Sequence, residues 1–404
     1  MENKKQFIKG ILAGFLLTVI LGGAAFGGCR MLTQASDEKK AESGELNLTG
    51  TEVQGKLAEI QNLIEQYYLD EVDAEQVENY LYKGAVVGLG DAYAAYYTRD
   101  EYQSLQDSTN GSYCGIGVQV TQNMSTGIIT ATKIFEGSPA EEAGMLPGDV
   151  LYQVDGQEVT GEDLTQVVSR IKGEEHTTVT ISVVREGQSD PMELEVERRT
   201  IEVSTVEHRM LDGSIGYIAV SSFDDVTVNQ FLDALDDLEA QGEESLIIDL
   251  RNNGGGLVSS VCQMLDRLLP EGLIVYTEDK YGHREEEYSD AENHFDKPLA
   301  VLVNGNSASA SEIFAGAIKD YGIGTLVGTQ TFGKGIVQKV YPLSDGTAVK
   351  LTVSKYYTPK GNNIHGIGIA PDVEVELDAD VANEVTIPEE KDNQLQKAIE
   401  VLTE

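Results

Sequence analysis

The feature that most constrains this chain is the stretch from Asn304 to Gln338, where a run of small residues, NGNSASASEIFAG, joins two apolar segments. The segment before it, LAVLV, is short and rich in branched residues and follows Pro298, which predicts a buried strand. The segment after it, IFAGAIKDYG, has apolar residues at helical spacing and stops at Gly322, which predicts a helix. A strand that turns directly into a helix indicates an α/β fold, in which ligands bind at such turns.

Serines alternate with small residues at this junction, at Ser307, Ser309 and Ser311. Serine is a common first residue of helices, so a structural role in the turn is the simplest explanation for such a run. Ala308 and Ala310 leave space for a substrate backbone to approach Ser309. Composition alone does not rank the serines, and the choice among them depends on their chemical neighbours.

A lysine in a glycine-rich loop is a candidate base for one of the serines. Lys334 lies between Phe332 and Ile336, and Gln338 follows four residues later. A serine becomes a good nucleophile when a base removes its proton, and lysine can be that base only when burial lowers its pKa. The apolar neighbours favour burial of Lys334. Residues four apart share a face in a strand and nearly so in a helix, so Gln338 can orient the lysine.

Two other chemistries have weaker support. The loop GTQTFGKG matches most of the phosphate-binding pattern GxxxxGK[ST], but Gly335 stands where a Ser or Thr hydroxyl should hold magnesium. No histidine lies in a GxSxG turn or an HExxH metal motif, and we interpret all of them as surface or structural residues: His176, His208, His283, His294 and His365. A nucleotide-dependent enzyme is therefore a minor alternative.

The serine and lysine motifs together resemble one family. VNGNSASASEIFAG followed by GTQTFGKGIVQ resembles the bacterial carboxyl-terminal processing proteases, also called tail-specific proteases, which use a Ser-Lys dyad. The resemblance implies that Ser309 is the nucleophile, Lys334 the general base and Gln338 the amide that orients the lysine. It also implies an α/β fold, with a crotonase-like protease core, an inserted PDZ domain and an N-terminal helical region. It implies neither a metal nor an organic cofactor.

A second glycine-rich segment, RNNGGG, follows the apolar run LIIDL. After a buried strand, consecutive flexible residues present backbone N–H groups to a cleft, which suits the stabilisation of an oxyanion. The resemblance implies that the N–H groups of Ala310 and Gly255 form the oxyanion hole, although Gly256 is close enough in sequence to be the donor instead. A phosphate-binding or purely structural loop is the alternative.

Residues 112–198 resemble a PDZ domain. The loop CGIGVQV and the segment GSPAEEAGMLPGDVLYQVDG, with its short helix, turn and strand, carry this resemblance. In such a domain an extended peptide adds to the edge of a sheet, and backbone N–H groups of the loop bind its terminal carboxylate. The expected peptide-binding residues are Gly115, Ile116, Gly117 and Val118.

The N-terminus predicts a membrane anchor. Three lysines among the first nine residues precede an uncharged apolar run from Gly10 to Gly28, which is marginal in length for a bilayer span and long for a signal peptide. With the basic end in the cytoplasm, the remainder lies outside it. The expectation is a single-pass protein of the cell membrane with an extracytoplasmic catalytic part. Cleavage of a signal peptide and lipidation of Cys29 is the alternative.

The composition excludes several classes of partner and site. The 404 residues include 29 basic and 68 acidic side chains, which argues against nucleic acid as a partner. The three cysteines support neither a disulfide framework nor a metal site. The expected parts are an anchor or signal at 1–30, a flexible linker at 31–50, a helical region at 51–111, a PDZ domain at 112–198, and an α/β serine protease core with a C-terminal helix at 199–404.

The sequence therefore predicts a membrane-tethered serine endopeptidase whose PDZ domain binds the exposed C-terminal tails of protein substrates. In related proteases the helical region helps to form dimers, so a homodimer through its tyrosine-rich face is expected, with packing inside its own domain as the alternative. The sequence leaves room for an activating partner protein but names neither this partner nor the substrate. A catalytically silent PDZ scaffold is the main alternative, and the presence of both Ser309 and Lys334 argues against it.

Overall fold

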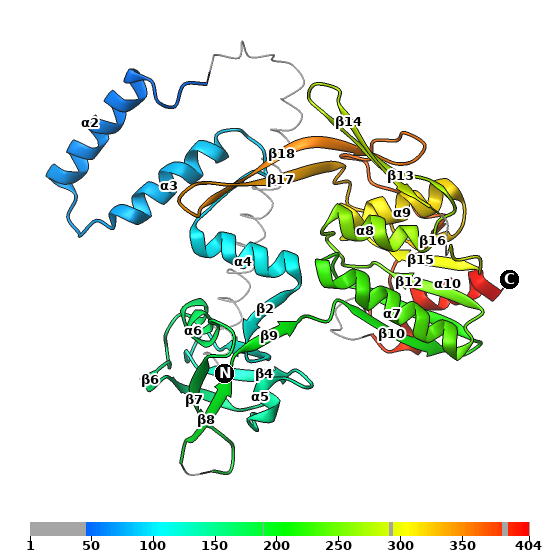
Figure 1. Ribbon diagram of the computed structural model, residues 1–404, viewed down its shortest axis with the longest axis horizontal. Helices are drawn as coiled ribbons and strands as arrows, with labels where there is room; N and C mark the ends of the chain where they lie inside the picture. The colour runs from blue at the N-terminus through cyan, green and yellow to red at the C-terminus, as the bar shows by residue number, and fades with distance from the viewer. Residues whose placement is uncertain (1–45, 189, 291–293, 382–386, 404) are drawn as a thin grey trace, which may run out of the picture. The chain divides into compact units, whose positions relative to one another are not determined.

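The computed structural model describes residues 46–188, 190–290, 294–381 and 387–403 (Figure 1). The chain divides into two compact units between Asp73 and Ala74, and each unit is described by itself. The described part of the first unit contains one helix, α2 (Thr51–Tyr67), which buries none of its residues. Several of its apolar side chains, such as Leu63, are exposed. The described residues of this unit therefore offer α2 no hydrophobic partner.

The predicted single-pass membrane anchor finds no support in the structure. No helix in the described residues is both long and apolar enough to cross a bilayer. The longest helices there, α2 and α7 (Asp225–Gln241), have 17 residues each and carry charged side chains, whereas a span needs about 20 predominantly apolar residues. The run from Gly10 to Gly28 and Cys29 lie outside the described residues. We therefore correct the prediction and assign no membrane anchor.

The second unit begins with two helices and a short strand between them: α3 (Ala74–Val87), β1 (Ala95–Tyr97) and α4 (Arg99–Asn110). A reciprocal capping box begins α4, because Thr98 N–H donates to Glu101 Oε2 at 2.8 Å and Glu101 N–H donates to Thr98 Oγ1 at 3.4 Å. Gly111, in the left-handed conformation, ends this helix. The helices expected in the N-terminal region are thus present.

The region that resembles a PDZ domain forms a sheet around its own hydrophobic core. Its elements are β2 (Ser112–Gly115), β3 (Val118–Gln122), β4 (Ile129–Ile134), α5 (Pro139–Glu142), β5 (Val150–Val154), β6 (Gln157–Glu158), α6 (Leu164–Ile171), β7 (Thr178–Val184), β8 (Met192–Glu197) and β9 (Arg199–Glu202). The sheet has the order β3-β4-β5-β7-β8, with β6 paired to β5, and β2 pairs separately with β9. Val179, Ile181 and Val183 alternate along β7 and face a core that includes Val167 and Ile171 of α6.

The remaining chain is built on a mostly parallel sheet of order β10-β11-β12-β15-β16-β19, in which only the β10–β11 pair is antiparallel. Its elements besides α7 are β10 (Val206–Leu211), β11 (Ile215–Val220), β12 (Ser245–Asp249), α8 (Val258–Asp266), β15 (Leu299–Val303), α9 (Ala310–Tyr321), β16 (Thr325–Gly328), β19 (Val373–Glu374), the short 3₁₀ helix η2 (Glu389–Lys391) and α10 (Asn393–Thr403). The predicted strand LAVLV is β15, and the predicted helix after it is α9.

Helices cover both faces of this sheet, which explains why β12 and β15 are buried along their whole length. Ile248 and Val301 pack into the core formed with α7, α8 and α9, whereas the alternate residues Ile247 and Leu302 pack with α10 (Figure 1). Because β12 and β15 are parallel neighbours, the loops that follow them leave the sheet at the same edge. This topology brings the RNNGGG loop beside the serine-rich turn.

Another sheet, with the order β1-β18-β13-β14 and with β17 paired to β18, begins next to the loop that carries the lysine. Its further strands are β13 (Gly272–Asp279), β14 (Arg284–Ser289), β17 (Ile336–Pro342) and β18 (Ala348–Tyr357). The strands β17 and β18 form a hairpin whose connection contains Asp345 and Gly346. Lys334 lies just before β17 and Gln338 lies within it.

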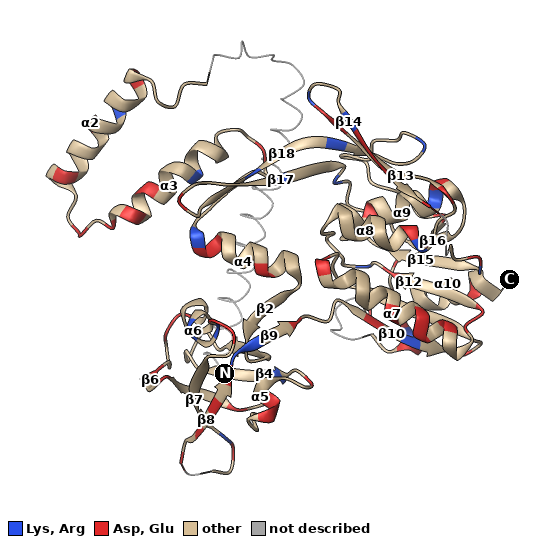
Figure 2. Ribbon diagram, in the orientation of Figure 1, with Lys and Arg blue, Asp and Glu red and all other residues tan. Residues whose placement is uncertain are grey.

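Acidic side chains are spread over the molecule rather than gathered at one place. Figure 2 shows Asp and Glu on α2, α3, α5, α7 and β14. A dispersed distribution of this kind fits a solvated acidic surface better than a binding site for one cationic partner.

Candidate active site

Ser309 occupies a strained backbone position at the turn from β15 into α9. Its φ is 56° and its ψ is −112°, a conformation that non-glycine residues rarely adopt. Tyr356 of β18 donates its hydroxyl to Ser309 O at 3.0 Å, and Ser309 N–H donates to Glu312 Oε2 at 3.0 Å. Strained residues persist only where surrounding contacts hold them, and they cluster at functional sites.

The surroundings of the three serines distinguish them. Ser307 is buried and donates its hydroxyl to Leu250 O at 2.8 Å, and Ser311 is buried and donates to Asn253 O at 2.8 Å. Both hydroxyls therefore tie the turn to the loop after β12. Ser309 differs because it is only partly buried and lines a cavity that also contains Lys334.

Glu312 holds the backbone of Ser309 and the lysine loop together. Its side chain is fully buried, and Oε2 accepts the N–H groups of Ser309 at 3.0 Å and Lys334 at 2.8 Å. Oε1 accepts the N–H of Gly333 at 2.7 Å and the hydroxyl of Thr331 at 2.6 Å. One carboxylate thus accepts four hydrogen bonds, and two of the donors are the backbone N–H groups of the predicted nucleophile and base.

The environment of Lys334 favours its neutral form. Burial lowers the pKa of Lys334, the nearby positive charge of Lys350 lowers it further, and the carboxylate of Glu312 opposes both effects. A lysine base requires a lowered pKa of this kind. Lys334 Nζ also lies 5.0 Å from the centroid of the Tyr93 ring, a cation–π distance.

The predicted catalytic side chains lie near one another but are not hydrogen-bonded to each other. In the described part of the chain no hydrogen bond joins Ser309 Oγ to Lys334 Nζ, although both residues line the same cavity. Gln338 lines this cavity too, and its Nε2 donates to Thr352 Oγ1 at the long distance of 3.5 Å rather than to Lys334. The structure therefore brings these residues together without a formed dyad.

The loop after β12 packs directly against Ser309. A Cβ added to Gly255, whose φ is 103°, would lie 2.8 Å from Ser309 Cβ and 2.9 Å from Ala310 N, so only glycine allows this approach. The Gly255 N–H donates to Asn253 Oδ1 at 2.8 Å. Asn253 is buried, and its backbone carbonyl also accepts the N–H of Ala308 at 3.0 Å. Thus Gly255 lies at the predicted oxyanion hole while its N–H group is engaged elsewhere.

A buried ion-pair network anchors the base of this loop to the C-terminal helix. Arg251 Nη2 lies 2.6 Å from Asp249 Oδ2 and 2.7 Å from Asp392 Oδ2, just before α10. Tyr217 donates its hydroxyl to Asp249 at 2.8 Å. Burial raises the pKa of Asp392, but the hydrogen bonds and positive charge of Arg251 outweigh burial and hold that pKa below its usual value. This arrangement fits a bracing role for Asp249 and Arg251.

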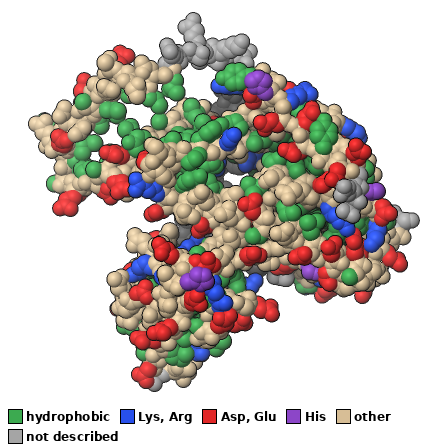
Figure 3. Space-filling model, in the orientation of Figure 1, with side chains coloured by type: hydrophobic (Ala, Val, Ile, Leu, Met, Phe, Trp, Pro, Cys, Tyr) green, Lys and Arg blue, Asp and Glu red, His purple; other side chains and the backbone are tan. Residues whose placement is uncertain are grey.

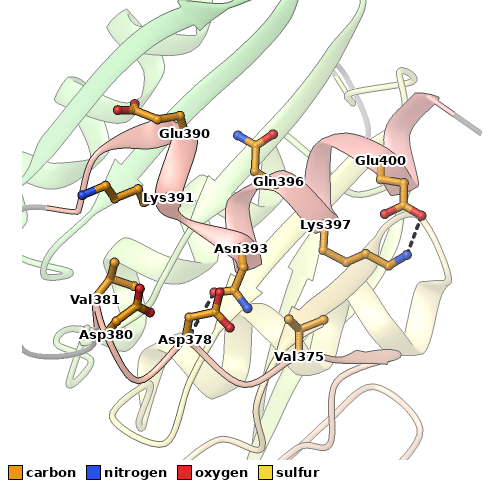
Figure 4. A pocket seen from close by; sticks show the side chains of 10 residues that line it. All are labelled: Val375, Asp378, Asp380, Val381, Glu390, Lys391, Asn393, Gln396, Lys397 and Glu400. Carbon is orange, nitrogen blue, oxygen red and sulfur yellow. Dashed lines mark hydrogen bonds and ion pairs between the residues drawn. The ribbon is translucent and has the colours of Figure 1, made fainter.

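The cavity beside Ser309 has a volume of about 320 Å³ and a mixed lining. Its apolar side chains include Leu105, Leu257, Ile313 and Ile336, and no histidine is among its described lining residues. A separate cavity of about 440 Å³ adjoins α10 and contains none of the predicted catalytic residues (Figure 4). Its Lys397 is paired with Glu400 at 2.7 Å, as the dashed line in Figure 4 marks.

The predicted peptide-binding loop lines a narrow cavity of about 120 Å³ next to α6. The residues that line it are Tyr113, Gly115, Ile116, Gly117, Val118, Val120, Val168, Ile171 and Lys172. Gly117 has a φ of 76°, and a Cβ there would lie 2.3 Å from Ser138 Cβ, so glycine is required. The Ile116 carbonyl accepts the N–H of Ala140 at 2.9 Å, which fixes the loop on α5.

Several residues near the site were not identified from the sequence. Glu312 lies three residues after Ser309, the Ser-x-x-Glu spacing of a capping box, and this spacing could have drawn attention to it. Tyr93 lies in the predicted helical region at 51–111, for which no role in catalysis was expected. Tyr356 has no local signal, because its contact with Ser309 joins residues 47 positions apart.

Comparison with known proteins identifies the family. Residues 214–375 match peptidase family S41, and residues 131–185 match the PDZ domain. The carboxyl-terminal-processing protease of Synechocystis sp. is 39% identical over 308 residues, which cover 75% of this chain and 72% of that protein. The carboxy-terminal processing protease CtpA of Bacillus subtilis is 36% identical over 330 residues, covering 81% and 70%. A solved photosystem II D1 C-terminal processing protease is 31% identical, covers 78% of this chain and 86% of its own, and has a TM-score of 0.47.

The identity to the Synechocystis protein extends over about three quarters of both chains, so it reaches beyond the shared motifs. The segment that matches peptidase family S41 contains Ser309, Lys334 and the loop after β12, and the segment that matches the PDZ domain precedes it in the chain. The chain therefore belongs to the carboxyl-terminal processing proteases of peptidase family S41 and is a serine-type peptidase with a PDZ domain.

Proposed function

We propose that this peptidase cleaves peptide bonds with Ser309 as nucleophile and Lys334 as general base, and that Gln338 orients the lysine. The observation that carries the proposal is the carboxylate of Glu312, which accepts the backbone N–H groups of both Ser309 and Lys334. Burial, which lowers the pKa of Lys334, supports its role as a base. In this mechanism Lys334 takes the hydroxyl proton as Ser309 attacks and then donates a proton to the leaving amine.

The oxyanion that forms in this attack needs backbone donors. We assign them to the N–H of Ala310, the first residue of α9, and to that of Gly255. The Gly255 N–H donates to Asn253 Oδ1 in this structure, so binding of substrate has to turn this peptide group, or the neighbouring Gly256 N–H has to replace it. The lack of a Ser309–Lys334 hydrogen bond fits the same resting state, because catalytic contacts often form only in the substrate complex.

The test compares the full chain with Ser309→Ala and Lys334→Ala on an unfolded protein substrate. Both variants should lose cleavage, because neither half of a dyad works without the other. Lys339→Ala is the matched control, since Lys339 is an exposed lysine on β17 outside the cavity, and it should keep activity. Cleavage that persists in Ser309→Ala would show that a residue other than Ser309 is the nucleophile. A wild-type protein that binds tails without cutting them would instead be a silent scaffold.

For the PDZ domain we propose boundaries at 112–198, followed by the protease core at 199–404, and a role in binding C-terminal tails of protein substrates. The core built around α6 and β7 contains only residues between Ile116 and Val196, which supports these boundaries. The cavity beside Gly115, Ile116, Gly117 and Val118 supports the binding mode. A peptide with a free carboxylate should bind, and the same peptide with an amidated C-terminus should bind at least tenfold more weakly.

We also propose that the protein is a homodimer through the apolar faces of its N-terminal helices. Figure 3 shows hydrophobic side chains exposed over these helices. On α3, Tyr80 is 68% exposed and Val87 is 70% exposed, and α2 buries no residue at all. Exposed apolar surface of this kind marks interaction sites in soluble proteins. Sedimentation should give a dimer for the wild type and a monomer for a Tyr80→Glu variant, and a wild-type monomer at high concentration would contradict the proposal.

A further inference from the structure

One aromatic residue outside the serine and lysine motifs contacts the predicted base. Tyr93 lies in the turn between α3 and β1, and the centroid of its ring is 5.0 Å from Lys334 Nζ. A cation within about 6 Å of a ring centroid is attracted by the ring face, most strongly where water is excluded. Both residues are partly buried. The contact joins residues that are far apart in sequence and belong to different structural elements.

The turn that carries Tyr93 is attached firmly to the sheet that carries Lys334. The strand β1 pairs with β18, and Ala95 is opposite Lys350. Tyr93 N–H donates to Asp91 Oδ1 at 2.9 Å, which closes the turn. Tyr96 is buried, and its hydroxyl donates to Asn79 of α3 at 3.3 Å. Strand pairing and buried contacts therefore hold the backbone that carries Tyr93 in place.

The same turn also contacts the neighbours of Gln338. Thr352, which is opposite Gln338 in the β17–β18 ladder, accepts the Gln338 amide at 3.5 Å and donates its hydroxyl to Asp91. Burial raises the pKa of Asp91, but the hydrogen bonds from Thr352, Tyr93 and Ala94 outweigh burial and lower it. One turn thus contacts Lys334 through Tyr93 and the partner of Gln338, Thr352, through Asp91.

From these contacts we propose that Tyr93 is a positioning residue for Lys334 and that the turn at residues 88–94 is part of the active site. The inference rests on the proposed role of Lys334 as the base. In the resting enzyme the ring face holds the ammonium group of Lys334 in the absence of a hydrogen bond to Ser309. When substrate binds, the ammonium group releases its proton to solvent, and the neutral nitrogen moves from the ring to Ser309, where it accepts the hydroxyl proton.

This arrangement has a defined electrostatic consequence. The ring face stabilises the charged lysine, so Tyr93 raises the pKa of Lys334 and opposes the effect of burial. Burial and the negative charges of Asp91 and Glu312 raise the pKa of the Tyr93 hydroxyl, so the ring remains a neutral phenol while Lys334 titrates. The charged or titratable groups that line the site around Lys334 are Tyr93, Asp91, Asp224, Glu312, Lys350 and Tyr356.

The experiment measures the titration of Lys334 directly in the full chain, without relying on activity. The rate at which an acylating reagent labels Lys334 is followed by mass spectrometry as a function of pH, in the wild type, Tyr93→Phe and Tyr93→Leu. Phenylalanine keeps the ring face, and leucine keeps apolar bulk without it. Tyr341→Leu is the matched control, because Lys339 Nζ lies 5.9 Å from the Tyr341 ring on the same strand, β17. Thermal melting checks that each variant is folded.

Tyr93→Phe should titrate like the wild type, whereas Tyr93→Leu should lower the titration midpoint of Lys334 by about 0.4–1.5 pH units, the equivalent of one cation–π contact. The alkaline rise of kcat/KM should shift in the same direction, and Tyr341→Leu should shift neither. An unchanged midpoint in a folded Tyr93→Leu variant overturns the proposal, and so does an equal shift in Tyr93→Phe. If cleavage proves independent of Lys334, the proposed function fails, while the labelling result still reports on the ring contact.

Discussion

Replacing Glu312 by glutamine removes the negative charge that joins the two halves of the proposed dyad. Glutamine keeps one acceptor oxygen. Its amide nitrogen is a donor and cannot accept the hydrogen bonds that the second carboxylate oxygen of Glu312 accepts. If the oxygen stays near Gly333, the N–H groups of Ser309 and Lys334 lose their partner. Hydrogen bonds to charged groups contribute about 1.5–3 kcal/mol each, so the loss of two costs about 3–6 kcal/mol before relaxation.

A loss of this size is large for a protein whose total stability is about 5–15 kcal/mol. For a domain of 150–250 residues, about 3 kcal/mol lowers the melting temperature by about 6–12 °C. Calorimetry of the full chain resolves such a shift. Glu278→Gln is the matched control, because Glu278 forms an exposed ion pair with Arg284 at 3.1 Å, and loss of an exposed pair costs at most about 1 kcal/mol.

The catalytic consequence is measured separately from stability, below the melting transition. A fluorophosphonate probe that acylates active serines should react with folded Glu312→Gln at least tenfold more slowly than with the wild type, because Ser309 and the lysine loop are no longer held together. Wild-type melting together with a wild-type rate of probe labelling in Glu312→Gln would refute this reasoning. A lower melting temperature with unchanged labelling would leave Glu312 only a structural role.

Three further predictions concern the base, the turn and the loop anchor. Burial lowers the pKa of Lys334, so peptide hydrolysis should rise with pH through a midpoint below about 10.4, the ordinary lysine value, and a histidine-like midpoint that survives Lys334→Arg would contradict this. Ser307→Ala should destabilise the core by about 0.5–1.5 kcal/mol, because the buried Leu250 carbonyl loses one of its two donors and keeps the Asn253 N–H, but the remaining folded protein should keep activity per molecule. The pKa of Asp392 is lower in the folded state than in the unfolded state, so the stability from its pair with Arg251 is present above about pH 4 and is lost as pH falls through the lowered folded value. Acid denaturation of Asp392→Asn should therefore show a shallower dependence on pH, and an unchanged dependence would exclude the pair as a contributor.

Much of the fold could be predicted because its signals are local. The apolar run before Asn304 and the helical spacing up to Gly322 each depend on a few consecutive residues, and the structure confirms the strand and the helix. The PDZ-like loop and the RNNGGG loop are local in the same sense, because backbone geometry imposes glycine at Gly117 and Gly255. The membrane prediction went wrong where a hydrophobic run was read as an anchor without structural support.

Only the tertiary structure decided which groups meet. Composition did not rank the three serines, and only the family resemblance selected Ser309. In the structure their burial and partners distinguish them, because Ser307 and Ser311 bond to a loop more than 50 residues away. Glu312 contacts both Ser309 and Lys334, and Tyr93 contacts Lys334. These contacts likewise depend on how distant segments of the chain pack together, which sequence periodicity does not encode. Local patterns specify which elements form, whereas the packing of sheets and helices determines which side chains lie within hydrogen-bonding distance and how far burial shifts the pKa of a lysine.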